Sequence, residues 1–258
     1  MKKYILSSLV LALSCLVFFT ACDDDDAADI TGNVDISFNA VYDGTPLDIQ
    51  AATYDYPSGA DLKVQLFQYY ISDLSLLPAD GGDAVQLSEI ELIRYNTAGA
   101  SNAQALTFDN VPVGEYSGLR FGLGVKPELN NQPPSNFAAD FVLNEAEYWN
   151  DMVRYVFAKI EANVDLENDG TFDTPVSYHM GNNDIYTTLT FSGDFSIAEN
   201  MTTEFEVLAD VLSALAASDT DFHDFSDPDQ RIVHGGNQAI SADIWTRLRD
   251  QFRLSIVQ

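Results

Sequence analysis

Hydrophobic and polar residues alternate along much of the chain with a period of two, which is the spacing of a β-strand buried on one face. In residues 34–42, Val34, Ile36 and Phe38 alternate with polar residues before an Asp-Gly turn. Residues 62–77 continue the pattern as one long strand or as two strands joined by a bend. The other predicted strands cover residues 85–95, 113–125, 153–164, 185–195 and 204–207. Many short strands between turns predict a mainly β fold, a β-sandwich of antiparallel strands with a few short helices.

Two segments predict helices instead. Residues 144–152 begin with Asn144, a residue type that caps helix N-termini, and continue with acidic residues in the first turn. Residues 241–252 place four large apolar residues on one helical face, with Ser241 as the predicted N-cap.

The first 21 residues resemble the signal peptide of a bacterial lipoprotein. Lys2 and Lys3 precede an apolar run over residues 4–19, which is short for a membrane span, and small residues then lead to Cys22. The resemblance implies that Cys22 becomes the lipidated first residue of the mature protein and anchors it in the outer membrane. An ordinary signal peptide or a single transmembrane anchor is the alternative.

Residues 22–32 are predicted to form an acidic tether, because four aspartates follow Cys22 directly. In this position they resemble the export tag of surface lipoproteins in the Bacteroidetes. This favours exposure at the cell surface over an anchor that faces the periplasm. Residues 33–258 are then assigned to one β-sandwich domain.

Charge and cysteine content exclude several classes of function. The formal net charge is -28, so the protein is expected to repel nucleic acid and anionic lipid. Of the two cysteines, Cys15 leaves with the signal peptide and Cys22 carries lipid, which excludes thiolate metal sites and cysteine nucleophiles. Motifs of serine hydrolases, phosphate-binding loops, dinucleotide sites and zinc proteases are absent from the sequence. We therefore expect a protein that is not an enzyme, with a carboxylate pair placed for glycoside cleavage as the alternative.

Residues 148–181 concentrate the rarest side chains of the chain. Trp149 is one of two tryptophans and His179 is one of three histidines. Imidazole is a ligand that suits copper, zinc and iron. The block is therefore the first candidate for a metal site.

Four segments resemble, in the same order, the motifs of the MbnP-like family of exported copper-binding proteins. They are the Tyr-Tyr-Ile-Ser strand at residues 69–76, the Tyr-x-x-Leu-x-Phe-x-Leu-Gly-Val segment at 116–125, the block of Trp149, residues 155–161 and His179-x-Gly, and the His-containing segment that starts at His234. The likeness covers roughly residues 34–254. It implies a β-sandwich that binds or handles copper outside the cell. It also implies work alongside a haem peroxidase-like protein and an outer-membrane transporter.

The resemblance further implies a copper ion held by two imidazoles and by a tryptophan that can be oxidised. The matching residues are His179 and His234, with Trp149 as third ligand or redox partner. Asp151 stands where the family pattern Trp-x-His has a histidine, so one expected ligand is replaced by a carboxylate. Each histidine is also open to a structural role, and Trp149 to that of a core aromatic. The departure at Asp151 supports the alternative function, a cell-surface adhesion or glycan-binding module without a metal site.

A second candidate site is the acidic segment at residues 165–173. Asp165, Glu167 and Asp169 alternate before a glycine, with Asp173 beyond it, and so resemble the first half of a calcium loop. The bidentate glutamate of an EF-hand is missing, so the alternative is an acidic hairpin with a glycine turn. Calcium bound here would be structural.

Overall fold

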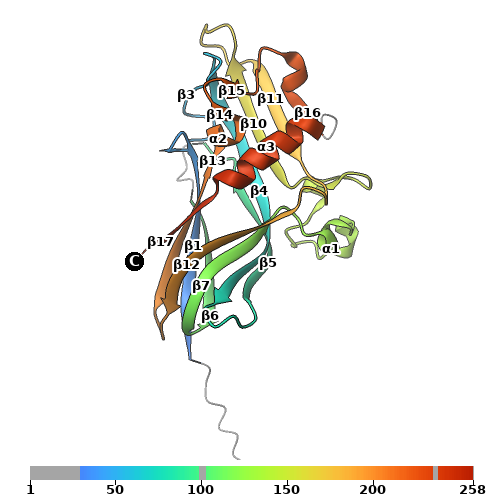
Figure 1. Cartoon of the computed structure of the whole chain (residues 1–258). Helices are drawn as coiled ribbons and strands as arrows, with labels where there is room; N and C mark the ends of the chain where they lie inside the picture. The colour runs from blue at the N-terminus through green and yellow to red at the C-terminus, as the bar shows by residue number, and fades with distance from the viewer. Residues whose placement is uncertain (1–29, 99–102, 235–237, 258) are drawn as a thin grey trace, which may run out of the picture.

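The computed structural model describes residues 30–98, 103–234 and 238–257. Two β-sheets form the sandwich that the sequence predicts (Figure 1). The predicted signal peptide, Cys22 and most of the predicted tether lie outside the described residues. The first strand begins at Thr31, inside the predicted tether.

The smaller sheet contains the first and the last described strands. Its order is β17 (Arg253–Val257), β13 (Thr202–Asp210), β1 (Thr31–Tyr42) and β2 (Thr45–Pro46), with β6 (Ala103–Pro112) also paired to β1. The large sheet has the order β12 (Thr187–Ile197), β7 (Gly114–Leu123), β4 (Asp61–Pro78), β10 (Ala158–Asp165), β11 (Thr174–Met180) and β16 (Ile232–His234), with β3 (Tyr54–Asp55) and β5 (Val85–Tyr95) also paired to β4.

Most strand pairs are antiparallel, but two of the described pairs run parallel: β1 with β13 and β11 with β16. Parallel neighbours need a long crossover connection, so each pair joins parts of the chain that are far apart in sequence. The pairing of β11 with β16 matters most here, because both strands carry a histidine.

Strand β4 connects the two halves of the large sheet. It is one continuous strand, the first of the two predicted arrangements, and it pairs with β10 along its first half and with β7 along its second half. Its register shifts near Asp73, whose φ of 52° lies in the left-handed region. Figure 1 shows the resulting upper half of the sheet, with β10, β11 and β16.

The predicted helix at residues 144–152 is wrong. Asn144 does cap a helical turn, but this is a 3-10 turn of three residues (Glu145–Glu147), followed by β8 (Tyr148–Asn150) and β9 (Arg154–Tyr155). The side chain of Asn150 accepts the backbone N–H groups of Met152 and Val153, which fixes a turn where a helix would continue.

The second predicted helix exists but starts earlier. Helix α3 spans Gln238–Gln251, so Ser241 lies inside it and is not its N-cap. Trp245 and Leu248 are buried, as the periodicity predicts. The remaining short elements are α1 (Pro127–Asn130), the 3-10 turns Pro134–Asn136 and Pro228–Gln230, α2 (Val211–Leu215), β14 (Ala216–Ser218) and β15 (Asp221–Phe222).

The core lies between the sheets and beneath α3. Phe38 of the smaller sheet meets Phe121 of the large sheet, with ring centroids 6.2 Å apart. Higher up, α3 covers the inner face of the large sheet, where Trp245 meets Phe157 at 6.1 Å (Figure 1). The inner face of the upper sheet is thus closed, and its outer face is left for other contacts.

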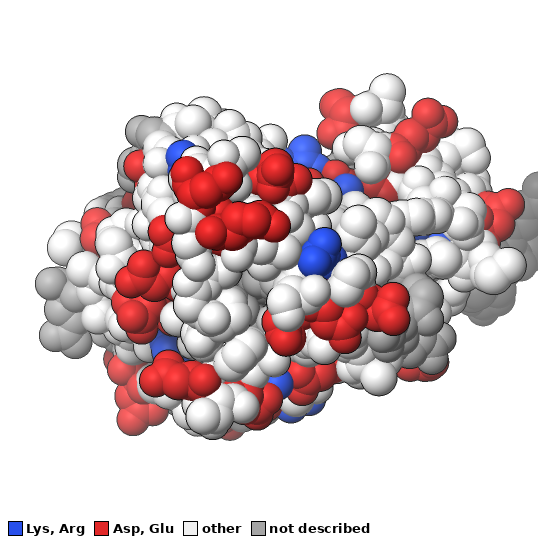
Figure 2. All heavy atoms as spheres, turned by 90° about the horizontal axis from the view of Figure 1, so that it is seen from above, with Lys and Arg blue, Asp and Glu red and all other residues white. Residues whose placement is uncertain are grey.

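Acidic side chains gather in several groups at the end of the molecule seen from above, with few basic ones between them (Figure 2). In the described ranges, no helix combines the length and apolar character needed to cross a membrane.

Candidate metal site

A row of polar residues crosses five strands of the large sheet in register. Arg94 of β5 lies opposite Gln68 of β4, followed by Lys159 of β10, His179 of β11 and His234 of β16. Residues in register share one face of a sheet. Their sequence neighbours in β10 and β11 are buried in the core, so the row lies on the outer face.

The two histidines form a stacked pair at one end of this row. Their ring centroids are 4.4 Å apart and the rings are inclined by 22°. Ser177 Oγ lies 3.2 Å from His179 Nε2 and 3.0 Å from His234 Nε2. The distance between the two Nε2 atoms therefore cannot exceed the sum of these two distances. Both nitrogens thus face the same hydroxyl, and sharing one ion at ligand distances of about 2 Å would require them to lie within about 4 Å of each other.

Trp149 covers this pair. Its ring centroid is 5.8 Å from that of His179, at an interplanar angle of 72°, and 5.2 Å from that of His234, at 59°. The tryptophan is 44% exposed, which sets it apart from the core aromatics. The structure thus brings together Trp149, His179 and His234.

A carboxylate that the sequence did not single out also lies beside this pair. Glu161 Oε1 lies 2.7 Å from His179 Nε2, and this hydrogen bond lowers the pKa of the Glu161 carboxyl below its ordinary value. Glu161 lies opposite Ser177 in the next strand. The signal was its place at the end of the segment 155–161, two positions from Lys159 and therefore on the same face.

The pKa of His234 also lies below its ordinary value. Partial burial is the main cause and the nearby His179 the second, while Glu161 acts in the opposite direction. A lowered pKa keeps the imidazole neutral over a wider range of pH. Neutral imidazole is the form that binds metal ions.

Asp151 is not brought to the histidines. It lies in the turn after β8, where Tyr148 Oη donates to its Oδ1 at 2.6 Å. Within the described residues, Asp151 has no hydrogen bond or ion pair with either histidine. The carboxylate that the sequence suggested as a replacement ligand is thus hydrogen-bonded to Tyr148 instead.

The predicted calcium loop is held by its own backbone. Asp165 is buried, and its two carboxylate oxygens accept the N–H groups of Asp169 (3.1 Å) and Gly170 (2.7 Å). Glu167 and Asp173 are exposed. These contacts are those of the alternative, an acidic hairpin with a glycine turn, and calcium stays a prediction.

The donors around His179 fit part of a copper site. Among the described residues, no group of three or more His, Cys, Asp or Glu side chains is arranged to hold a metal ion. The two imidazoles converge, however, and His179 Nδ1 is buried without a hydrogen-bond partner. Two nitrogen donors beside one carboxylate are ligand types that suit copper, but within the described ranges no third ligand stands with the two imidazoles in a metal-binding arrangement.

A pocket of about 350 Å³ opens beside His179. Met152 and Val153 of the turn after β8 line it, together with Asn182 and Ile185 from the segment after β11. The pocket gives small solutes access to His179, whereas His234 is not part of its lining.

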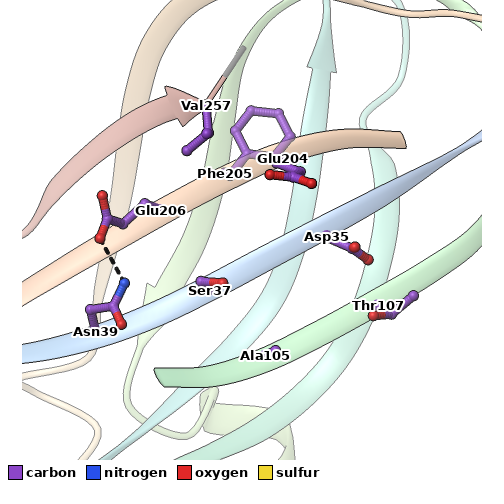
Figure 3. A pocket seen from close by; sticks show the side chains of 9 residues that line it. All are labelled: Asp35, Ser37, Asn39, Ala105, Thr107, Glu204, Phe205, Glu206 and Val257. Atoms are coloured by element: carbon purple, nitrogen blue, oxygen red, sulfur yellow. Dashed lines mark hydrogen bonds between the residues drawn. The ribbon is translucent and has the colours of Figure 1, made fainter. Parts of the chain in front are cut away.

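A second hollow of about 360 Å³ lies on the outer face of the smaller sheet (Figure 3). Its carboxylates are those of Asp35, Glu204 and Glu206, and Asn39 Nδ2 donates to Glu206 Oε1 at 2.7 Å. Its lining contains no imidazole, so it does not compete as a copper site.

Comparisons with known proteins agree with this fold. The family described as MbnP matches residues 31–233, a span that ends directly before His234. The chain is similar to the solved structure "MbnP from Methylosinus trichosporium", with 16% identity, a TM-score of 0.51, and coverage of 88% of this chain and 99% of that one. At this identity the likeness shows a shared fold. No match was found among curated proteins. Because the family match covers most of the sequence, the chain belongs to the MbnP family.

Proposed function

We propose that this protein is an exported lipoprotein that binds copper outside the cell and does not catalyse a reaction. The observation that carries the proposal is the convergence of His179 and His234 beneath Trp149, in a member of the MbnP family.

The histidine pair would hold the ion through its imidazole nitrogens, and copper would add redox activity next to an indole. Ser177 now bonds to both imidazoles and would give up these hydrogen bonds. Glu161 supplies a negative charge beside the cation. Divalent copper binds such nitrogen sites more tightly than the other first-row divalent ions do.

The predicted lipid anchor at Cys22 and the predicted acidic tether support a place on the outer membrane, at the cell surface or facing the periplasm. A haem peroxidase-like protein and an outer-membrane transporter are the proposed partners, on the strength of the family resemblance alone. The acidic surface disfavours nucleic acid.

The adhesion or glycan-binding alternative would be favoured by a row of exposed tyrosines and tryptophans. Trp149 is the only exposed aromatic residue in the described part of the chain. A single exposed tryptophan does not form such a row.

Copper titration of the mature protein tests the proposal. Wild type is expected to bind one copper ion, with nitrogen couplings in its electron paramagnetic resonance spectrum. His179→Ala and His234→Ala each remove a ligand, so affinity should fall by more than the roughly 10–100-fold that loss of an outer-shell partner costs.

The matched control is His223→Gln. His223 is buried at α3, where its Nε2 lies 3.0 Å from Asp243 Oδ2, so this variant should bind copper as wild type does. Wild-type affinity in both His179→Ala and His234→Ala would refute the site.

A further inference from the structure

The polar row that ends in the two histidines carries a buried ionic cluster at its other end. Glu147 is 3% exposed and accepts a hydrogen bond from Gln68 Nε2 at 2.8 Å. It forms ion pairs with Lys159, at 2.6 Å, and with Arg94. A buried carboxylate is costly unless it is paired and hydrogen-bonded, and here both oxygens are engaged.

Glu147 and Trp149 belong to one short segment that crosses the strands of the sheet. Tyr148 between them is extended, with φ of -94° and ψ of 113°, so its two neighbours project to the same side. Two residues of extended chain span about 6.6 Å, which is roughly one and a half times the distance between neighbouring strands. A glutamate seated over β4 and β10 therefore places the tryptophan over β11 and β16, where the histidines lie.

The backbone alone does not fix this position firmly. Strand β8 has three residues and β9 has two, and further contacts are the hydrogen bond from Val156 N–H to the Glu147 carbonyl at 2.9 Å and the packing of the Tyr148 ring on Tyr155. Movement of the segment across the sheet by one strand would separate Glu147 from its partners and leave a buried charge unpaired. The ionic cluster therefore opposes that movement.

We propose that Glu147 is a positioning residue: its ion pairs with Arg94 and Lys159 hold Trp149 over His179 and His234. The role in metal binding rests on the proposed function, whereas the placement of Trp149 does not depend on any metal. Glu147 acts through Trp149 and does not itself contact the histidine pair.

The test compares Glu147→Gln with Glu145→Gln, an exposed residue of the same 3-10 turn. The readout is the near-ultraviolet circular dichroism and emission of Trp149 without metal, taken as the difference from the same protein with Trp149→Phe, which removes the contribution of the buried Trp245. Glu147→Gln should lose the Trp149 dichroism and shift its emission to the red, while Glu145→Gln should match wild type. Copper affinity should fall by about tenfold or more in Glu147→Gln, as for loss of an outer-shell partner.

Should Glu147→Gln fail to fold, Arg94→Gln provides the test, because the Arg94 side chain is 34% exposed and its replacement leaves Lys159 to pair with Glu147. It should show the same change in Trp149 at smaller amplitude. An unchanged Trp149 signal in a folded Glu147→Gln, or in Arg94→Gln, would overturn the inference even where copper binds. Conversely, a wild type without copper affinity would refute the proposed function, and the metal-free signal would still decide the role of Glu147.

Discussion

At the scale of single residues, the protonation state of the two histidines decides whether they can bind a metal ion. The pKa of His234 lies below its ordinary value of 6.5, so the unfolded chain binds more protons than the folded one between the lowered pKa and about 6.5. The stability linked to this group is therefore lost as pH falls through that window. Glu161 has the same sign: its pKa is lowered from 4.5, and its contribution is lost as pH falls below that value. Copper binding should weaken in the same direction, because protons compete for the imidazoles.

The variant Glu161→Gln tests the effect of the Glu161 charge on the pKa of His234. The carboxylate of Glu161 raises the pKa of His234, so its neutralisation should lower that pKa further. Nuclear magnetic resonance titration of the His234 ring protons measures the change. Glu199→Gln, in the exposed turn after β12, is the control that should leave His234 unchanged. A His234 pKa that rises in Glu161→Gln would contradict the assigned electrostatics.

At the scale of the elements, close packing between neighbouring segments explains the glycine in the His-x-Gly motif, Gly181. A Cβ on Gly181 would lie 2.5 Å from the carbonyl oxygen of Tyr155 and 2.8 Å from the backbone nitrogen of Phe157. The segment that joins β9 to β10 therefore passes directly against the end of β11. His179 lies on β11, and Trp149 lies on β8, which pairs with β9. A side chain at position 181 would therefore push the two residues apart.

Gly181→Ala should destabilise the protein by about 1–3 kcal/mol, the usual cost of an atom added to a closely packed place. Urea unfolding measures the loss. Gly193→Ala is the matched strand control, because a Cβ there would make only an ordinary contact of 3.5 Å with Ile256. Equal stability of the two variants would show that the close approach at Gly181 carries no cost.

Local pattern predicted some elements well and others badly. Residues 85–95 were predicted as a strand and form β5 with the predicted bounds. Strand β6 was missed because it is mostly exposed and carries few large apolar residues, with Gln104 at one of its less exposed positions. The helix predicted at residues 144–152 failed because Glu147 finds its partners on β4, β5 and β10, contacts that no short window of sequence contains.

At the scale of the whole molecule, the site depends on topology that periodicity does not contain. His179 and His234 meet through a parallel pair of strands, with β12 and β13 lying between them in sequence. Only the family resemblance pointed to the two histidines together. It pointed equally to Asp151, but in the structure the Asp151 carboxylate accepts a hydrogen bond from Tyr148.

The proposed anchor concerns the whole protein as well. Cys22→Ser should release the protein from the membrane fraction of its host, because the serine cannot carry the lipid. Mass spectrometry of the N-terminal peptide should find acyl chains on Cys22 in wild type. Cys15→Ser, within the predicted signal peptide, should stay anchored. Retention of Cys22→Ser in the membrane at the wild-type level would count against the lipoprotein assignment.

The parallel pairing of β11 with β16 also determines the stage of folding at which the two histidines meet. Ser177 and His234 are 57 positions apart, and the chain between them contains strands of both sheets. Closing a loop of this length costs conformational entropy, which the packing of the intervening strands offsets. In the proposed export, a chain that has crossed the cell envelope only in part would therefore present its histidines one at a time. Copper capture would then mark the end of folding, and the bound ion would add its own binding free energy to the stability of the finished protein.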